Sequence, residues 1–297
     1  MTDLADQIRI LRDDAGLVVL DREVILATGE AVVDYLQGQL SQDVADMGPG
    51  VARWAFILQP QGKVDAWFRV TRLDEATFVL DIDAGWADQL LARLERFKLR
   101  TPVTFEKVDW QVTAARGPAV PTPAAPPDPA RGLVVPVEWP GEVGWDLIGD
   151  GGADLGLPEC EPAAAEALRI EAGRPRMGHE LDDATIPNET GMVPLSVSFT
   201  KGCYTGQELV ARVDSRGNNT PRRLVGIHLT GPVESGTPLL HEDKDVGRIT
   251  SVAAVSSFGH PVALAYLARG VDLPADLDAA GEQARAVALP LVEDTTA

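Results

Sequence analysis

Residues 201–208, Lys-Gly-Cys-Tyr-Thr-Gly-Gln-Glu, contain the most reactive side chain that the sequence offers, the thiol of Cys203. Gly202 and Gly206 flank this cysteine and let the backbone turn tightly and approach a ligand closely. A thiol becomes reactive where nearby positive charge favours its thiolate form, and Lys201 lies two residues away. The segment is therefore the first candidate for a reactive-cysteine site.

The residues after Cys203 have the pattern of a helix start. Thr205 and Glu208 are spaced as a capping box, in which a hydroxyl and a carboxylate each accept a backbone N–H. This spacing predicts a short helix over residues 207–213, with its positive end near the Cys203 sulfur. Two interpretations stay open from the residues alone: a reactive thiol, or a small apolar side chain buried beside a capped turn.

The composition limits the classes of function. With 45 acidic and 26 basic side chains the net charge is −19, which disfavours direct binding to nucleic acid or to an anionic membrane. No apolar run is long enough to span a membrane, and two cysteines make no disulfide framework, so we expect a cytoplasmic protein. The four histidines lack ligand spacing and the cysteines are too few for a cluster, so no metal site is predicted.

Residues 169–223 differ from the rest of the chain in charge, with eight basic against seven acidic side chains. An anionic ligand would prefer this region, and Arg176, Lys201 and Arg212 are among its basic residues. The alternative is that these side chains pair with surface carboxylates. Glu189 follows a proline in a loop, where a carboxylate can be held to accept two hydrogen bonds from an amidine-like edge such as a pterin; otherwise it is solvated. Asp65, on the polar face of a predicted strand, is by itself a surface residue.

The elements that position these residues mix strands with helices and predict an α+β fold. Strand-like runs, in which apolar and polar residues alternate, predict two hairpins. One covers residues 17–27, with Asp21 and Arg22 in the turn, and the other covers residues 54–70, around Gly62. Helical spacing predicts a helix over residues 30–47 and a second one capped by Asp83. Pro162, suited to a first helical position, and Gly173, suited to the residue just past a helix, predict a third over residues 162–173.

We predict four segments along the chain. They are an N-terminal α+β domain (1–117), a proline-rich linker (118–131), a central α+β domain (132–220) and a C-terminal β-barrel (221–297).

Residues 201–208 resemble the signature of the YgfZ family, the folate-binding relatives of the glycine-cleavage aminomethyltransferase (T-protein) that support iron–sulfur protein maturation. Residues 35–44, Tyr-Leu-Gln-Gly-Gln-Leu-Ser-Gln-Asp-Val, resemble that family's first-domain helix. Residues 168–173, Leu-Arg-Ile-Glu-Ala-Gly, with the following Gly178, Asp182, Pro187 and Glu189, resemble the central segment shared with aminomethyltransferases. Segments 223–226, 246–251 and 263–267 resemble the C-terminal barrel.

The resemblance implies a three-domain ring around a central folate site, with tetrahydrofolate or a one-carbon derivative as cofactor. It implies that Cys203 is the functional thiol and that Glu189 is the best candidate for pterin recognition. Further cofactor-binding candidates are Lys201, Tyr204, Arg212 and Arg176. The implied partners are iron–sulfur assembly or client proteins, and any effect on tRNA modification is expected to be indirect.

One departure from the aminomethyltransferases bears on activity. They carry an Asp pair after the glycine turn of the second hairpin, whereas residues 62–67 here read Gly-Lys-Val-Asp-Ala-Trp. The pair is absent, Trp67 or Ala66 falls near the expected carboxylate, and Asp65 is a displaced substitute. We therefore expect a folate-dependent accessory protein in iron–sulfur cluster assembly or repair. A folate-dependent aminomethyltransferase or methyltransferase is the alternative, and a scaffold that acts only through partners is a third.

Overall fold

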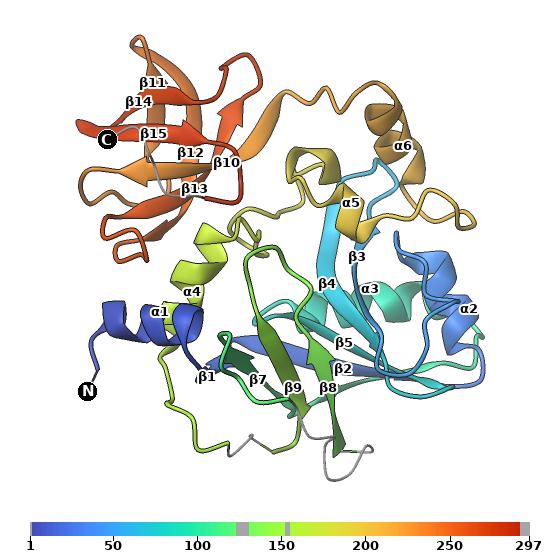
Figure 1. Ribbon diagram of the computed structural model, residues 1–297. Coiled ribbons are helices and arrows are strands. Elements are labelled where there is room, and N and C mark those ends of the chain that lie inside the picture. Colours follow the sequence, from blue (N-terminus) through green and yellow to red (C-terminus); the bar gives the residue numbers. More distant parts are fainter. Residues whose placement is uncertain (1, 123–130, 152–154, 292–297) are drawn as a thin grey trace.

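The computed structural model describes residues 2–122, 131–151 and 155–291, and residues 123–130 of the expected linker lie outside them. Figure 1 shows the chain from its N-terminal helix to its C-terminal barrel. The elements of the first half are α1 (Leu4–Asp13), β1 (Gly16–Leu20), β2 (Arg22–Thr28), α2 (Val32–Gln39), β3 (Ala52–Leu58), β4 (Val64–Arg72), β5 (Thr77–Asp83), α3 (Ala87–Lys98), β6 (Thr104–Val108), β7 (Gln111–Arg116), β8 (Gly132–Pro136) and β9 (Gly144–Gly149). Those of the second half are α4 (Pro162–Glu171), the 3-10 helix η2 (Pro187–Glu189), α5 (Val193–Ser196), α6 (Gln207–Ser215), β10 (Arg222–Leu229), β11 (Pro238–His241), β12 (Lys244–Ala253), β13 (Val262–Ala268), β14 (Ala275–Ala279) and β15 (Glu282–Val287).

A five-stranded antiparallel sheet, in the order β3-β4-β5-β2-β6, forms the larger part of the N-terminal half. The hairpin predicted over residues 54–70 is confirmed as β3 and β4, which place Phe56 opposite Trp67. Helices α2 and α3 bury Leu36 and Leu94 in the same core cluster as Phe68 of this sheet. The alternation of apolar residues along β4 therefore sets the face that carries the main core.

The hairpin predicted over residues 17–27 is wrong. Strand β1 pairs with β7, whereas β2 pairs with β5 and β6 in the other sheet. Only Asp21 separates the two strands, and a tight hairpin needs a loop of at least two residues. The chain therefore passes from one sheet directly into the next. The second sheet has the antiparallel order β1-β7-β9-β8.

Two helix boundaries also differ from the prediction. Helix α2 ends at Gln39, well before Met47, because the Ser41 hydroxyl beyond it accepts the Phe56 N–H at 2.8 Å and donates to the Ser196 carbonyl. Helix α3 starts at Ala87 without a side-chain cap. The predicted cap, Asp83, is instead engaged by Arg22 at 3.1 Å. The third predicted helix is present as α4.

The C-terminal strands close into a six-stranded barrel in the order β10-β13-β12-β11-β14-β15, so the α+β class with a C-terminal barrel is confirmed. Figure 1 shows the barrel beside α4 and α1, while α6 lies on the far side of the molecule. Glu180 fixes the barrel to the preceding segment, because its buried carboxylate accepts from Ser251 at 2.5 Å and pairs with Arg169 at 3.1 Å. In the described residues, no helix is long and apolar enough to cross a membrane.

The two sheets are joined by buried ion pairs. Arg69 on β4 contacts Asp81 on β5 at 2.9 Å and Asp146 on β9 at 2.6 Å. Arg22 extends the network to Asp81 and Asp83, whereas Arg116 extends it from Asp146. Its far end is Glu142, which contacts Arg116 at 3.2 Å and Arg174 at 3.0 Å. Arginines and carboxylates thus alternate across the boundary between the sheets.

Burial alone would raise the pKa of Asp146, but the guanidinium groups of Arg116 and Arg69 hold it well below its ordinary value. The pKa of Arg69 is raised, because Asp81 and Asp146 outweigh the effect of burial. Removing one member of such a network leaves another charge buried without its partner, which is far more costly than losing a surface pair.

We predict that Asp146→Asn lowers the free energy of unfolding at neutral pH by about 3–5 kcal/mol, the cost of breaking a buried ion pair. Since the folded pKa lies below the unfolded value of about 3.9, the wild-type advantage is complete above about pH 4 and declines as the pH falls further. Urea unfolding at a series of pH values measures it. The control is Asp276→Asn, whose side chain is 84% exposed beside Arg285 and should matter little. Equal effects of the two substitutions would contradict the network's structural role.

Candidate functional site

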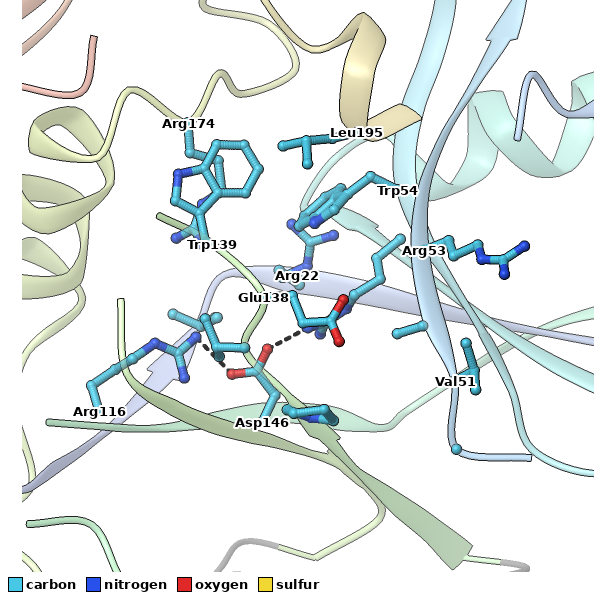
Figure 2. A pocket seen from close by; sticks show the side chains of 16 residues that line it. Arg22, Val51, Arg53, Trp54, Arg116, Glu138, Trp139, Asp146, Arg174 and Leu195 are labelled. Atoms are coloured by element: carbon cyan, nitrogen blue, oxygen red, sulfur yellow. Dashed lines mark hydrogen bonds and ion pairs between the residues drawn. The ribbon is translucent and has the colours of Figure 1, made fainter. Parts of the chain in front are cut away.

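A cavity of about 260 Å³ lies where the two sheets meet. Figure 2 shows that its residues come from both sheets, with Arg116 and Asp146 on one side and Trp139 and Arg174 on another. Five arginines, including Arg53, line it against the carboxylates Glu138 and Asp146. In a chain with a net charge of −19, this is a locally basic site. Neighbouring cavities of about 340 and 230 Å³ share Arg174 with it.

Three indole rings form the apolar part of this region. Trp54 stacks on Trp67 with ring centroids 4.2 Å apart, and Trp139 meets both rings edge-on at 6.0 and 6.3 Å. The Trp67 N–H donates to Ser196 Oγ at 2.9 Å, and the Trp139 N–H donates to the Ala172 carbonyl at 3.1 Å. Because Trp54 and Trp139 line the cavity, it offers fixed aromatic faces to a planar ligand.

Arginines lie over these indoles. The guanidinium carbon of Arg22 is 5.3 Å from the Trp54 ring centroid, and that of Arg174 is 5.6 Å from the Trp139 ring centroid. Both distances are within the range of cation–π attraction. Burial lowers the pKa of Arg174, although Glu142 acts in the opposite direction. The cavity therefore combines aromatic surface with positive charge, a combination that suits a flat ring bearing an anionic group.

Asp65 is not among the residues that line this cavity. Its carboxylate pairs with Arg93 of α3 at 3.0 Å, and its carbonyl accepts a hydrogen bond from Gln89 at 3.1 Å. Trp67, two residues later, is buried beneath Trp54. The region in which the resemblance places a carboxylate therefore contains an indole ring.

Cys203 lies on an exposed loop and does not line the cavity. The loop is fixed by Lys201, whose ammonium donates at 2.5–3.1 Å to the Gln37 carbonyl in the last turn of helix α2 and to the Leu40 and Gln42 carbonyls beyond it. Burial lowers the pKa of Lys201 to about 8. Lys201 is thus engaged in holding the loop, and the Cys203 thiol faces outward. The interpretation of Cys203 as a buried apolar residue is wrong.

Tyr204 is 8% exposed and belongs to the main core cluster, and burial raises its pKa to about 12. The Lys201 ammonium lies 5.3 Å from its ring centroid. The predicted helix is confirmed as α6, but the predicted capping box of Thr205 and Glu208 is wrong. The N-cap is Gly206, which makes no side-chain cap.

Gly206 is needed for close packing. It has a φ of +80°, and a Cβ atom there would lie 2.5 Å from the Gln59 carbonyl oxygen. The opposing turn contains Gly62, also at positive φ, where a Cβ would lie 2.5 Å from Leu209 Cβ. The cysteine loop therefore packs directly on the turn of the β3–β4 hairpin. Gly202, by contrast, has open space around it.

The other predicted ligand-binding residues are spread over the molecule. Glu189 is buried and accepts from Arg222 at 3.0 Å, whereas Arg212 is exposed on α6. Arg176 lines two cavities beside the central one and contacts Glu166 at 3.5 Å. Of the predicted site residues, only Arg176 thus lies near the cavities, and the binding roles of the others stay predictions. Trp54 and Trp139 were missed, because isolated tryptophans carry no spacing signal.

The comparisons with known proteins agree with this architecture. Residues 222–292 match the family model described as the glycine cleavage T-protein C-terminal barrel domain. The crystal structure of glycine cleavage system aminomethyltransferase T from Bartonella henselae has a TM-score of 0.83 at 20% identity, covering 98% of this chain and 90% of that one. The fold of the chain is therefore that of the glycine-cleavage T-protein.

Curated relatives extend the likeness over the sequence. An aminomethyltransferase of Streptomyces avermitilis is 27% identical, with 88% of this chain and 80% of that protein covered. An aminomethyltransferase of Rippkaea orientalis is 25% identical, with 96% and 87% covered. An uncharacterized protein of Haemophilus influenzae is 28% identical, with 66% and 68% covered.

We predict that Gly206→Ala destabilises the protein by more than about 1 kcal/mol, because a side chain is strained at this positive φ and meets backbone atoms. The displaced loop should also change the rate at which Cys203 reacts with a thiol reagent. Gly202→Ala is the matched control and should change neither quantity, since nothing lies within 4 Å of its added Cβ. Wild-type stability of Gly206→Ala would show that the close packing is unimportant.

Proposed function

We propose that this protein binds tetrahydrofolate, or a one-carbon derivative of it, in the central cavity and serves iron–sulfur cluster assembly or repair through Cys203. The observation that carries the folate part is the pairing of aromatic faces, Trp54 and Trp139, with arginines in one cavity. A reduced folate has a planar ring portion and at least one carboxylate, so the residues present fit it. The volume of about 260 Å³ is just below the range of roughly 300–1,000 Å³ typical of small-molecule pockets, and the neighbouring cavity of about 340 Å³ adjoins it at Arg174.

The side chains in and around the cavity favour binding of a folate over transfer of a group to it. Asp146, one of the two lining carboxylates, pairs with Arg69 and Arg116, and its low pKa keeps it from acting as a proton donor or acceptor near neutral pH. Glu138, the other, is exposed. Trp67 fills the region where the carboxylate pair is expected. When bound, the folate would supply a one-carbon carrier, and the protein's own residues would hold and orient it.

The thiol in this proposal serves partner proteins instead of the bound folate. Cys203 is exposed and lies on a loop that Lys201 and Gly206 hold in place. An accessible, fixed thiol can meet a residue or a cluster on an assembly or client protein. One thiol cannot hold a cluster alone, so the partner must provide the other ligands. Glu189, for which the resemblance implies a pterin contact, does not line the central cavity and pairs with Arg222, so the ring position proposed here does not use it.

The alternative function is folate-dependent aminomethyl transfer, which the relatives named aminomethyltransferases favour. It requires Asp65 to act as the carboxylate, although Asp65 is paired with Arg93 away from the cavity. Measurable turnover with a folate cosubstrate that is lost in Asp65→Asn would support this alternative. Turnover that Asp65→Asn leaves undiminished would exclude Asp65 from the chemistry.

We predict saturable binding of tetrahydrofolate to the purified protein, measured by quenching of tryptophan fluorescence and by calorimetry. Trp139→Leu should weaken binding by about 10-fold, as expected for the loss of one stacking face. Trp110→Leu is the matched control, because Trp110 packs on a separate core cluster and lines no described cavity. Absence of saturation at high micromolar ligand would refute the folate proposal.

We predict that Cys203→Ser fails to restore the activity of iron–sulfur enzymes in a strain that lacks this protein, because the hydroxyl cannot replace the thiol. The substituted side chain is exposed, so the folded protein should accumulate normally. Cys160→Ala is the control; it removes the other, buried thiol and should restore activity. Full restoration by Cys203→Ser would remove the thiol from the mechanism.

A further inference from the structure

Arg174 differs from the other arginines of the buried network in its hydrogen bonds. Arg22, Arg69 and Arg116 each use all three guanidinium nitrogens on carboxylates or carbonyls of the described residues. Arg174 uses only Nη1, on Glu142. Its Nε and Nη2 donate to no residue that the structure describes. The side chain is half-buried, and these two nitrogens are not among the fully buried polar atoms without a partner, so both are accessible to a ligand that could accept charge-assisted hydrogen bonds from them.

The position of Arg174 is fixed from both sides. Its backbone N–H donates to the Arg169 carbonyl at 3.1 Å, and the Arg169 guanidinium donates back to the Arg174 carbonyl. Its side chain is 16% exposed and lies over Trp139. Figure 2 shows Arg174 next to Trp139 at the edge of the central cavity. A side chain held in this way loses little conformational entropy when it binds.

Arg174 is also the arginine at which three cavities meet. It lines the central cavity, the cavity of about 340 Å³ that reaches α1, α4 and Phe258, and the cavity of about 230 Å³ beside α4. Leu20 is also shared by all three cavities, but Arg174 is the shared residue that offers hydrogen-bond donors.

We propose that Arg174 anchors the carboxylate-bearing portion of the ligand, while the planar ring lies against Trp54 and Trp139. This inference rests on the proposed folate site and assigns its specificity. The remaining network arginines are matched by Asp81, Asp83, Glu142 and Asp146, so the donors left over suit one carboxylate and not a polyphosphate. The site thereby selects a ring with a carboxylate tail over nucleotides and over rings that lack the tail.

The test compares two ligands on four proteins: the wild type, Arg174→Met, Arg174→Lys and a control. Tetrahydrofolate and 6-methyltetrahydropterin share the reduced ring, but the second lacks every carboxylate. Arg174→Met should weaken tetrahydrofolate binding by roughly 10- to 100-fold, the usual worth of a charge-assisted hydrogen bond, and leave the methylpterin affinity unchanged. Arg72→Met is the control, because Arg72 lines none of the described cavities and donates to the Met47 and Asp74 carbonyls. It should leave both affinities unchanged.

The outcomes separate this inference from the proposed function. If the wild-type protein binds tetrahydrofolate and Arg174→Met weakens both ligands equally, or neither, the anchoring role is overturned and the folate site stands. If the wild-type protein binds neither ligand, the folate site itself is overturned. Equal loss of both ligands counts against the anchoring role when Arg174→Met keeps the urea-unfolding curve of the wild-type protein; if Arg174→Met does not fold, Arg174→Lys decides in its place. Arg174→Lys keeps the positive charge. It should recover part of the tetrahydrofolate affinity and leave the methylpterin affinity unchanged.

Discussion

The buried contact between Arg69 and Asp146 is the interaction on which the rest of the structure depends. It joins the two sheets at their boundary. Through Asp81 and Arg116 it extends into a network whose arginines line the central cavity. Burying charges is costly unless each one is matched, and here nearly every guanidinium nitrogen has a partner. The same network therefore stabilises the arrangement of the sheets and fixes the guanidinium groups that line the candidate site.

The candidate chemistry is divided between two places that the β3–β4 hairpin connects. One end of the hairpin carries Trp54 and Trp67 at the cavity, and its turn at Gly62 packs on Gly206 of the cysteine loop. Asp65, the carboxylate nearest in sequence, pairs with Arg93 away from the cavity, and the indole of Trp67 is buried beneath Trp54.

The sequence predicted those features that local pattern controls. Alternation of apolar and polar residues found β3 and β4, residues suited to helix ends found α4 and α6, and turn-rich strands found the barrel. It could not predict the cavity, because Arg22, Arg69 and Arg116 lie on different strands and only tertiary pairing brings them together. The capping box failed for a similar reason, since packing against Gly62 selects a left-handed Gly206 over a side-chain cap. Arg174 lay within the basic segment but had no signal that distinguished it from its neighbours.

The central claim is that folate and thiol occupy separate sites, and a crystal structure with tetrahydrofolate bound tests it most directly. We expect the reduced ring against Trp54 and Trp139 in the central cavity. The Cys203 sulfur should then lie farther from the ring than two hydrogen-bond lengths, or roughly 6 Å. A ring bound beside Cys203, or at Glu189 outside the cavity, would contradict the account.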